Sequence, residues 1–65
     1  MNCCVHCEIR RAKNAIEIFI LRGVSKEEIA KTLTHRHEVV YYLVDNTLYR
    51  NNTTPPHTPY VVWIF

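Results

Sequence analysis

The 65-residue sequence has a single glycine, and no apolar run is longer than the six residues Tyr60–Phe65. A helix that spans a bilayer needs about 20 consecutive apolar residues, so no membrane contact is expected. No basic start followed by an apolar stretch opens the chain, so no signal peptide is expected either. A chain this short buries only about 60% of its unfolded surface, and a substrate or cofactor pocket of several hundred Å³ would take up most of its core. We therefore expect a small interaction domain with no cofactor and no small-molecule substrate, and not an enzyme.

The three cysteines all lie in the first seven residues, at Cys3, Cys4 and Cys7. An odd, clustered count is not the pattern of a disulfide framework, and without a signal peptide it favours reduced thiols in the cytoplasm. The Cys4-x-x-Cys7 spacing is half of a zinc site. Because no second pair with zinc spacing follows, we predict a flexible arm over residues 1–7 with no bound metal. Zinc binding stays open as an alternative, and the histidines available to complete such a site are His35, His37 and His57.

Apolar residues recur at three- and four-residue spacing through residues 8–22, which predicts a helix with one buried face. Gly23 follows this segment, where a left-handed C-terminal cap favours glycine. The basic excess of the chain also lies here, because residues 8–22 carry four basic and two acidic residues. Residues 23–50 carry four of each and are neutral.

The next start signal is Ser25 followed three residues later by Glu28, the spacing of a capping box. It predicts a short second helix over residues 26–33. Thr34 then offers a further N-cap, so a third helix is predicted over residues 35–50.

The remaining residues read as a tail. Residues 51–59 contain all three prolines of the chain and no apolar side chain apart from them, which predicts an extended linker. Residues 60–65, YVVWIF, are apolar and favour extended structure. Such a hexamer is prone to aggregate in water, so it either covers its own helices or inserts into a partner, for example as an added strand. The predicted fold is therefore all-α: a three-helix core over residues 8–50 with an extended, proline-containing tail over residues 51–65.

The stretch IAKTLTHRHEVVYYLV, from Ile29 to Val44, resembles the helix-turn-helix of transcription regulators and site-specific recombinases. Ile29 would pack inward from the first helix of the unit, and Val40 and Leu43 from the second. Thr34 replaces the turn glycine that is common in that motif. Because residues 23–50 are neutral and DNA affinity depends on neutralising phosphates, such a unit either binds DNA as a dimer or faces another protein.

The chain as a whole is similar to small transcription regulators of lytic bacteriophages, on the strength of that stretch, the capped entry VSKEE and the apolar tail. The resemblance implies binding to host bacterial RNA polymerase in the host cytoplasm, inhibition of initiation through the sigma factor and, in some members, suppression of termination. On this hypothesis helical aromatic and basic residues dock on the polymerase while the tail anchors the complex. The residues predicted to contact the partner are Arg10, Arg11, Arg36, His37, Tyr41, Tyr42, Trp63 and Phe65.

Two other functions fit the same sequence. One is a dimeric, sequence-specific DNA-binding repressor or recombination accessory factor that reads a short palindrome with its third helix, which makes DNA a secondary candidate partner. The other is a structural adaptor stabilised by zinc at Cys4 and Cys7.

Overall fold

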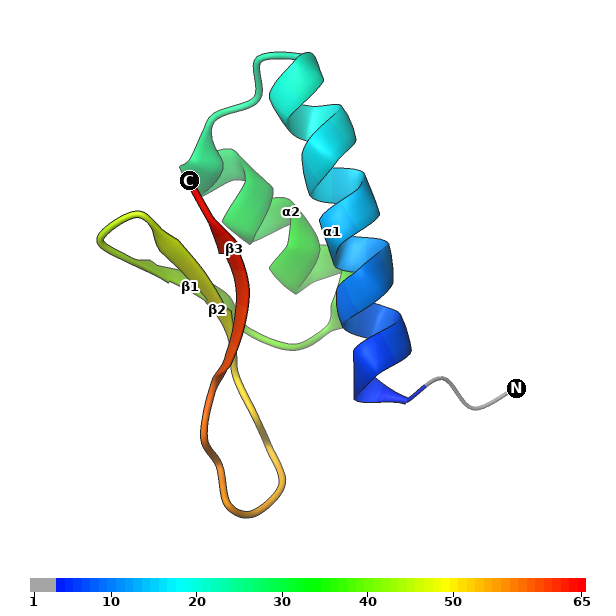
Figure 1. Cartoon of the computed structure of the whole chain (residues 1–65), viewed down its shortest axis with the longest axis vertical. Coiled ribbons are helices and arrows are strands. Elements are labelled where there is room, and N and C mark those ends of the chain that lie inside the picture. Colours follow the sequence, from blue (N-terminus) through cyan, green and yellow to red (C-terminus); the bar gives the residue numbers. More distant parts are fainter. Residues whose placement is uncertain (1–3) are drawn as a thin grey trace.

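The computed structural model describes residues 4–65 and combines two helices with a three-stranded antiparallel sheet (Figure 1). The sheet order is β1-β2-β3, so each strand pairs with its neighbour in sequence. The helices pack against the sheet, α2 over β1 and α1 over β3. The elements are α1 Val5–Leu21, α2 Lys26–His37, β1 Tyr41–Val44, β2 Thr47–Arg50 and β3 Tyr60–Ile64.

The predicted all-α fold is therefore wrong, and the molecule is a small α+β domain. The predicted third helix over residues 35–50 is instead the end of α2 followed by the β1–β2 hairpin. Most residues from Val39 to Tyr49 are β-branched or aromatic, types that fit a pleated and half-buried surface. Asp45, at φ 56, and Asn46 provide the tight turn between the strands. The helix-turn-helix interpretation of Ile29–Val44 fails with the third helix.

Thr34 does not end α2, although the second helix was predicted to stop at residue 33. Its hydroxyl does not cap a new helix but pairs with the backbone of β1. The Tyr41 amide donates to Thr34 Oγ1 at 2.8 Å, and the same hydroxyl donates to the Tyr41 carbonyl at 3.2 Å. The helix continues to His37 and ends at Glu38, which adopts the left-handed conformation at φ 58.

The helix starts follow the local signals more closely. Ser25 is the N-cap of α2, and its hydroxyl accepts from the Glu28 amide at 3.3 Å. Gly23 adopts φ 77 in the turn after α1, a conformation in which a β-carbon would be strained. Helix α1 begins at Val5, so the last residues of the predicted N-terminal arm belong to its first turn. The rest of that arm, residues 1–3, lies outside the described residues.

The predicted tail folds back onto its own domain. Strand β3 pairs antiparallel with β2. Leu48 pairs with Trp63 and Tyr49 with Val61, so the register shifts by one residue at Val62. This shift lets the adjacent Val62 and Trp63 both pack against the core. Val62 is buried and Trp63 packs against the core. The buried core is shared by all five elements, and its members are Ala12, Ile16, Ile29, Ala30, Leu33, Tyr41, Leu48 and Val62.

Candidate protein-binding surface

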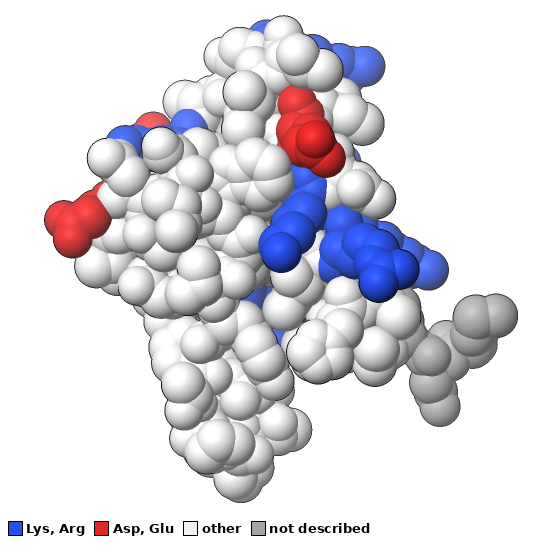
Figure 2. Space-filling model, in the orientation of Figure 1, with Lys and Arg blue, Asp and Glu red and all other residues white. Residues whose placement is uncertain are grey.

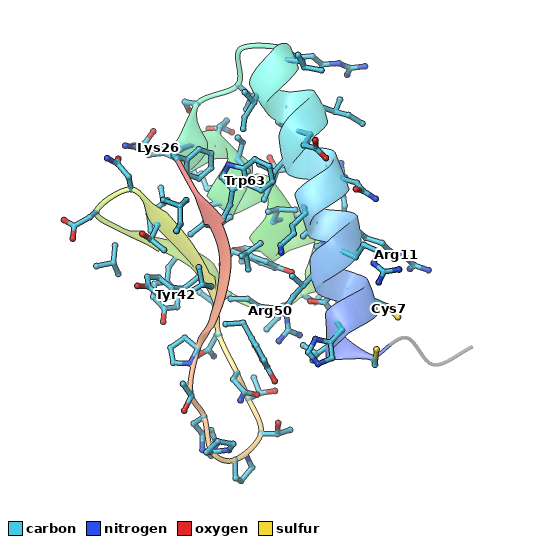
Figure 3. All side chains as sticks on the ribbon, in the orientation of Figure 1. Cys7, Arg11, Lys26, Tyr42, Arg50 and Trp63 are labelled. Carbon is cyan, nitrogen blue, oxygen red and sulfur yellow. The ribbon has the colours of Figure 1, made fainter. Side chains whose placement is uncertain are left out.

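An apolar hollow lies where the C-terminal end of α1, the start of α2 and the end of β3 meet. Its volume is about 510 Å³, and it opens to solvent. A second hollow of about 250 Å³ adjoins it and shares Ile20 and Trp63 as lining residues. Figure 3 shows Trp63 near Lys26, between the helices and the end of β3. We call the two hollows together the Trp63 surface, and its residues are Glu17, Ile20, Leu21, Gly23, Val24, Lys26, Trp63, Ile64 and Phe65.

Large apolar side chains on this surface are unusually exposed. Leu21 is 87% exposed and Ile64 is 73% exposed. Scattered apolar residues are normal on a protein surface, but contiguous apolar patches mark interaction sites. The Trp63 surface therefore has the composition of a docking site for another apolar surface.

The local sequence explains why these residues meet. The run from Ile18 to Leu21 contains four consecutive apolar residues, which is more than one buried face of a helix can hold. Phe19 packs against the core, whereas its neighbours Ile18, Ile20 and Leu21 remain exposed. At the end of β3, the Phe65 amide donates to the Asn46 carbonyl at 2.7 Å, which fixes the last residues beside the β1–β2 turn.

Charge is sparse on this surface and balanced. Glu17 lines one hollow and Lys26 the other, and the Lys26 ammonium donates to the Asn46 side-chain oxygen. A surface with one charge of each sign lacks the excess of cations that binding to a nucleic-acid backbone requires. It suits a protein partner better.

The basic residues of α1 form a separate region. Figure 2 shows lysine and arginine side chains gathered over the N-terminal half of α1, with an acidic side chain nearer the C-terminal half. The exposed basic residues of that half are Arg10, Arg11 and Lys13. Helix α1 therefore presents a basic outer face at one end and an apolar one at the other.

The structure brings two of the predicted contact residues together, since Trp63 and Phe65 both line the Trp63 surface. Arg10 and Arg11 lie on the basic half of α1. Arg36 lies at the end of α2 with its guanidinium 5.7 Å from the centre of the Phe19 ring.

The other three predicted contacts belong to the sheet region. Tyr42 stacks on Tyr49, with ring centres 5.6 Å apart, on the sheet face that points away from the helices. The His37 ring lies 5.7 Å from that of Tyr41. Tyr41 is only 3% exposed and belongs to the core. Its burial removes it from the set of side chains that can meet a partner.

Tyr41 has a structural partner that the sequence did not reveal. Its hydroxyl donates to Glu8 Oε2 at 3.0 Å, and Arg50 Nε donates to the same oxygen at 2.5 Å. The Glu8 and Arg50 side chains are 24% and 12% exposed. This Glu8 cluster, made of Glu8, Tyr41 and Arg50, ties the N-terminal half of α1 to strands β1 and β2.

The Glu8 cluster shifts the ionisation of all three groups. Partial burial opposes ionisation of Glu8 and is the largest single influence on it, but the hydrogen bonds from Arg50 and Tyr41 outweigh it and lower the pKa of Glu8. Burial, followed by the hydrogen bond to Glu8, raises the pKa of Tyr41 to about 12. The hydrogen bond to Glu8 raises the pKa of Arg50. The cluster is therefore an ionised pair with a protonated tyrosine at neutral pH.

Metal ligands do not gather in the part of the chain that the structure describes. Within residues 4–65, no three or more histidine, cysteine, aspartate or glutamate side chains are placed to hold a metal ion. None of His35, His37 and His57 joins Cys4 and Cys7 in such a group. Cys3 lies outside the described residues.

Comparison of the chain with protein-family models, curated proteins and solved structures finds no significant match. Over residues 4–65, neither helix has the length and apolar content needed to cross a membrane.

Proposed function

We propose that this protein is a protein-binding module that acts by occupying part of its partner, and that the Trp63 surface is its main contact. The observation that carries the proposal is the cluster of exposed apolar side chains around Trp63, with Leu21 and Ile64 the most exposed. Aromatic anchors surrounded by apolar contacts are typical of the residues that dominate binding energy at protein interfaces. The nearly uncharged lining favours the apolar surface of another protein over a nucleic acid.

The proposed partner is bacterial RNA polymerase in the cytoplasm of a host cell, with inhibition of initiation as the outcome and suppression of termination as a further effect. This choice rests on the sequence resemblance to small phage regulators. The helix-turn-helix part of that resemblance is withdrawn, because the third helix is a hairpin. The capped entry VSKEE and the terminal residues remain, and both border the Trp63 surface through Val24, Lys26 and Phe65. Arg10 and Arg11, on the N-terminal half of α1, supply a second, polar contact with the partner.

The alternative of a DNA-binding repressor receives less support from the structure. The element predicted to contact DNA was a helix over residues 35–50, and that segment is instead the end of α2 followed by strands β1 and β2. The outward face of these strands carries Tyr42, Val44, Thr47 and Tyr49, and none of these side chains is charged. We therefore retain the protein partner alone.

The test measures binding of the intact protein to purified bacterial RNA polymerase, as core enzyme and as holoenzyme, together with promoter-dependent initiation. Deletion of residues 51–65 is unsuitable because it would remove β3 from the sheet. Leu21→Glu is the informative variant, since Leu21 is 87% exposed and its replacement leaves the core intact. Val40→Glu is the matched control, because Val40 is 51% exposed and does not line the Trp63 surface.

We expect the wild-type protein and Val40→Glu to bind the polymerase alike, and Leu21→Glu to bind at least about 10-fold more weakly, which corresponds to about 1.4 kcal/mol. Failure of the wild-type protein to bind either form of the enzyme would exclude the polymerase as partner. Equal binding by Leu21→Glu would show instead that the contact lies on another face.

A further inference from the structure

Two thiols meet at the N-terminal end of α1. Cys4 is the N-cap residue of the helix, in an extended conformation with φ −70 and ψ 167, and Cys7 lies in the first turn. Their sulfur atoms are 3.3 Å apart, in direct contact. Both residues are exposed to solvent, and Figure 3 shows Cys7 at the N-terminal end of α1. A small molecule can therefore reach the pair without any movement of the fold.

The geometry around Cys4 favours its thiolate. The backbone amide of Cys7 has the largest effect in lowering the pKa of Cys4, followed by the Cys7 thiol, and the backbone amide of His6 acts in the same direction. These amides belong to the first turn of a helix, where backbone N–H groups have no partner within the helix and stabilise negative charge. Thiolates at helix N-termini and in Cys-x-x-Cys pairs are the reactive forms in thiol–disulfide exchange.

We propose that Cys4 and Cys7 form a redox-active dithiol that exchanges with low-molecular-weight disulfides, of which glutathione disulfide is the representative. The Cys4 thiolate attacks one sulfur of the disulfide, forms a mixed disulfide and expels the other half as a thiolate. The Cys7 thiol then gives its proton to water, attacks Cys4 Sγ and expels the second small thiolate. The protein loses two electrons as its two thiols form one disulfide, and the small disulfide gains them to become two thiols.

The second step is favoured by the contact already present. Sulfur atoms at 3.3 Å reach the bonding distance of about 2 Å by rotation of exposed side chains. The inference does not depend on the proposed function. The pair and the Trp63 surface lie toward opposite ends of α1, a helix of 17 residues and so about 25 Å long.

The test equilibrates the full-length protein with mixtures of reduced and oxidised glutathione, quenches with acid, alkylates the remaining thiols and maps the products by mass spectrometry. The variants are Cys3→Ser, Cys4→Ser and Cys7→Ser, each checked for unchanged helical content by circular dichroism. Because the described cysteines are exposed, their substitution leaves the core intact. Cys3→Ser is the matched control, since it removes one thiol from the same segment and keeps the pair.

We expect a reversible Cys4–Cys7 disulfide, lighter than the dithiol by two hydrogen atoms, in the wild-type protein and in Cys3→Ser with the same midpoint. Cys4→Ser and Cys7→Ser should lose it completely, and Cys7→Ser should accumulate glutathione on Cys4. At pH 7, Cys4 should alkylate faster than a cysteine in an unstructured peptide, because its lowered pKa raises its thiolate content. A disulfide that maps to Cys3, or thiols that stay reduced in oxidised glutathione alone, would overturn the proposal. So would stable glutathione adducts on both Cys4 and Cys7.

Discussion

The Glu8 cluster gives the sharpest test of how this fold is held together. Glu8→Gln removes the charge and keeps the shape, so Arg50 and Tyr41 face an amide where they now face a carboxylate. Breaking a fully buried ion pair costs about 3–5 kcal/mol, and an exposed pair contributes about 0.2–1 kcal/mol. With side chains 24% and 12% exposed, this pair lies between those limits, and we expect a loss of about 2 kcal/mol at pH 7.

That loss is large for a chain of this size. At about 0.05–0.15 kcal/mol per residue, a 65-residue domain has a total stability of about 3–10 kcal/mol. A change of about 2 kcal/mol lowers the Tm of such a domain by about 8–16 °C. The assay is thermal and urea unfolding followed by circular dichroism. Glu17→Gln is the matched control, because Glu17 lies on the exposed side of the same helix and its change should stay within about 0.5 kcal/mol.

The pH dependence supplies a second, independent check. The pKa of Glu8 is lowered in the folded state from its ordinary value of 4.5. Its contribution to stability is therefore complete above that value and is lost as pH falls through the lower pKa of the folded state. The difference between wild type and Glu8→Gln should shrink over the same range. A difference below 0.5 kcal/mol at pH 7, or one that stays constant as pH falls, would refute the assignment of Glu8 as an ionised tether.

Two further substitutions test the core and the end of α2. Leu48→Ala empties a fully buried position in the central strand, so we expect a loss of about 2–5 kcal/mol in urea unfolding; the half-exposed Val44→Ala is its control, and equal losses would contradict the placement of the core. Glu38 adopts a left-handed backbone conformation at φ 58, which glycine takes without steric strain. Glu38→Gly should therefore raise the free energy of unfolding by about 0.5–1 kcal/mol. A lower free energy of unfolding in that variant would contradict the conformation at the end of α2.

The sequence predicted those parts of the fold that short-range chemistry determines. The capping box at Ser25 marks the start of α2, and the spacing that includes Ala12 and Ile16 marks the buried face of α1. These signals depend on residues within one or two turns of each other. They therefore act in the same way whatever the rest of the chain does.

The hairpin was missed because its segment satisfies a helical and a strand pattern at once. Val40, Leu43 and Val44 recur at helical spacing, but in the structure Leu43 faces the core while Val40 and Val44 are half exposed. Short apolar runs are ambiguous between helix and strand, and β-branched and aromatic content decides between them. The pairing of Leu48 with Trp63 then completes the sheet. That contact joins residues 15 positions apart, beyond the reach of a local pattern.

The candidate surface was predicted only in part for the same reason. Trp63 and Phe65 stood out as large apolar residues near the end of the printed sequence. The apolar spacing in residues 8–22 places Ile20 on the buried face of the predicted helix and leaves Leu21 outside that face. Only the approach of β3 to the end of α1 shows that they border one hollow.

Strand β3 covers the helices of its own domain and still leaves apolar side chains exposed to solvent. The register irregularity in β3 lets one strand serve both purposes, because it breaks the usual alternation of side chains and allows the adjacent Val62 and Trp63 both to pack against the core. In β3, Val62 is 2% exposed and belongs to the core, whereas Ile64 is 73% exposed and lines the Trp63 surface. Trp63 takes part in both, because it packs against the core and borders both hollows. Docking at this surface therefore requires no release of the strand. A partner would meet an interface whose backbone is already ordered by the sheet, which lowers the entropic cost of binding.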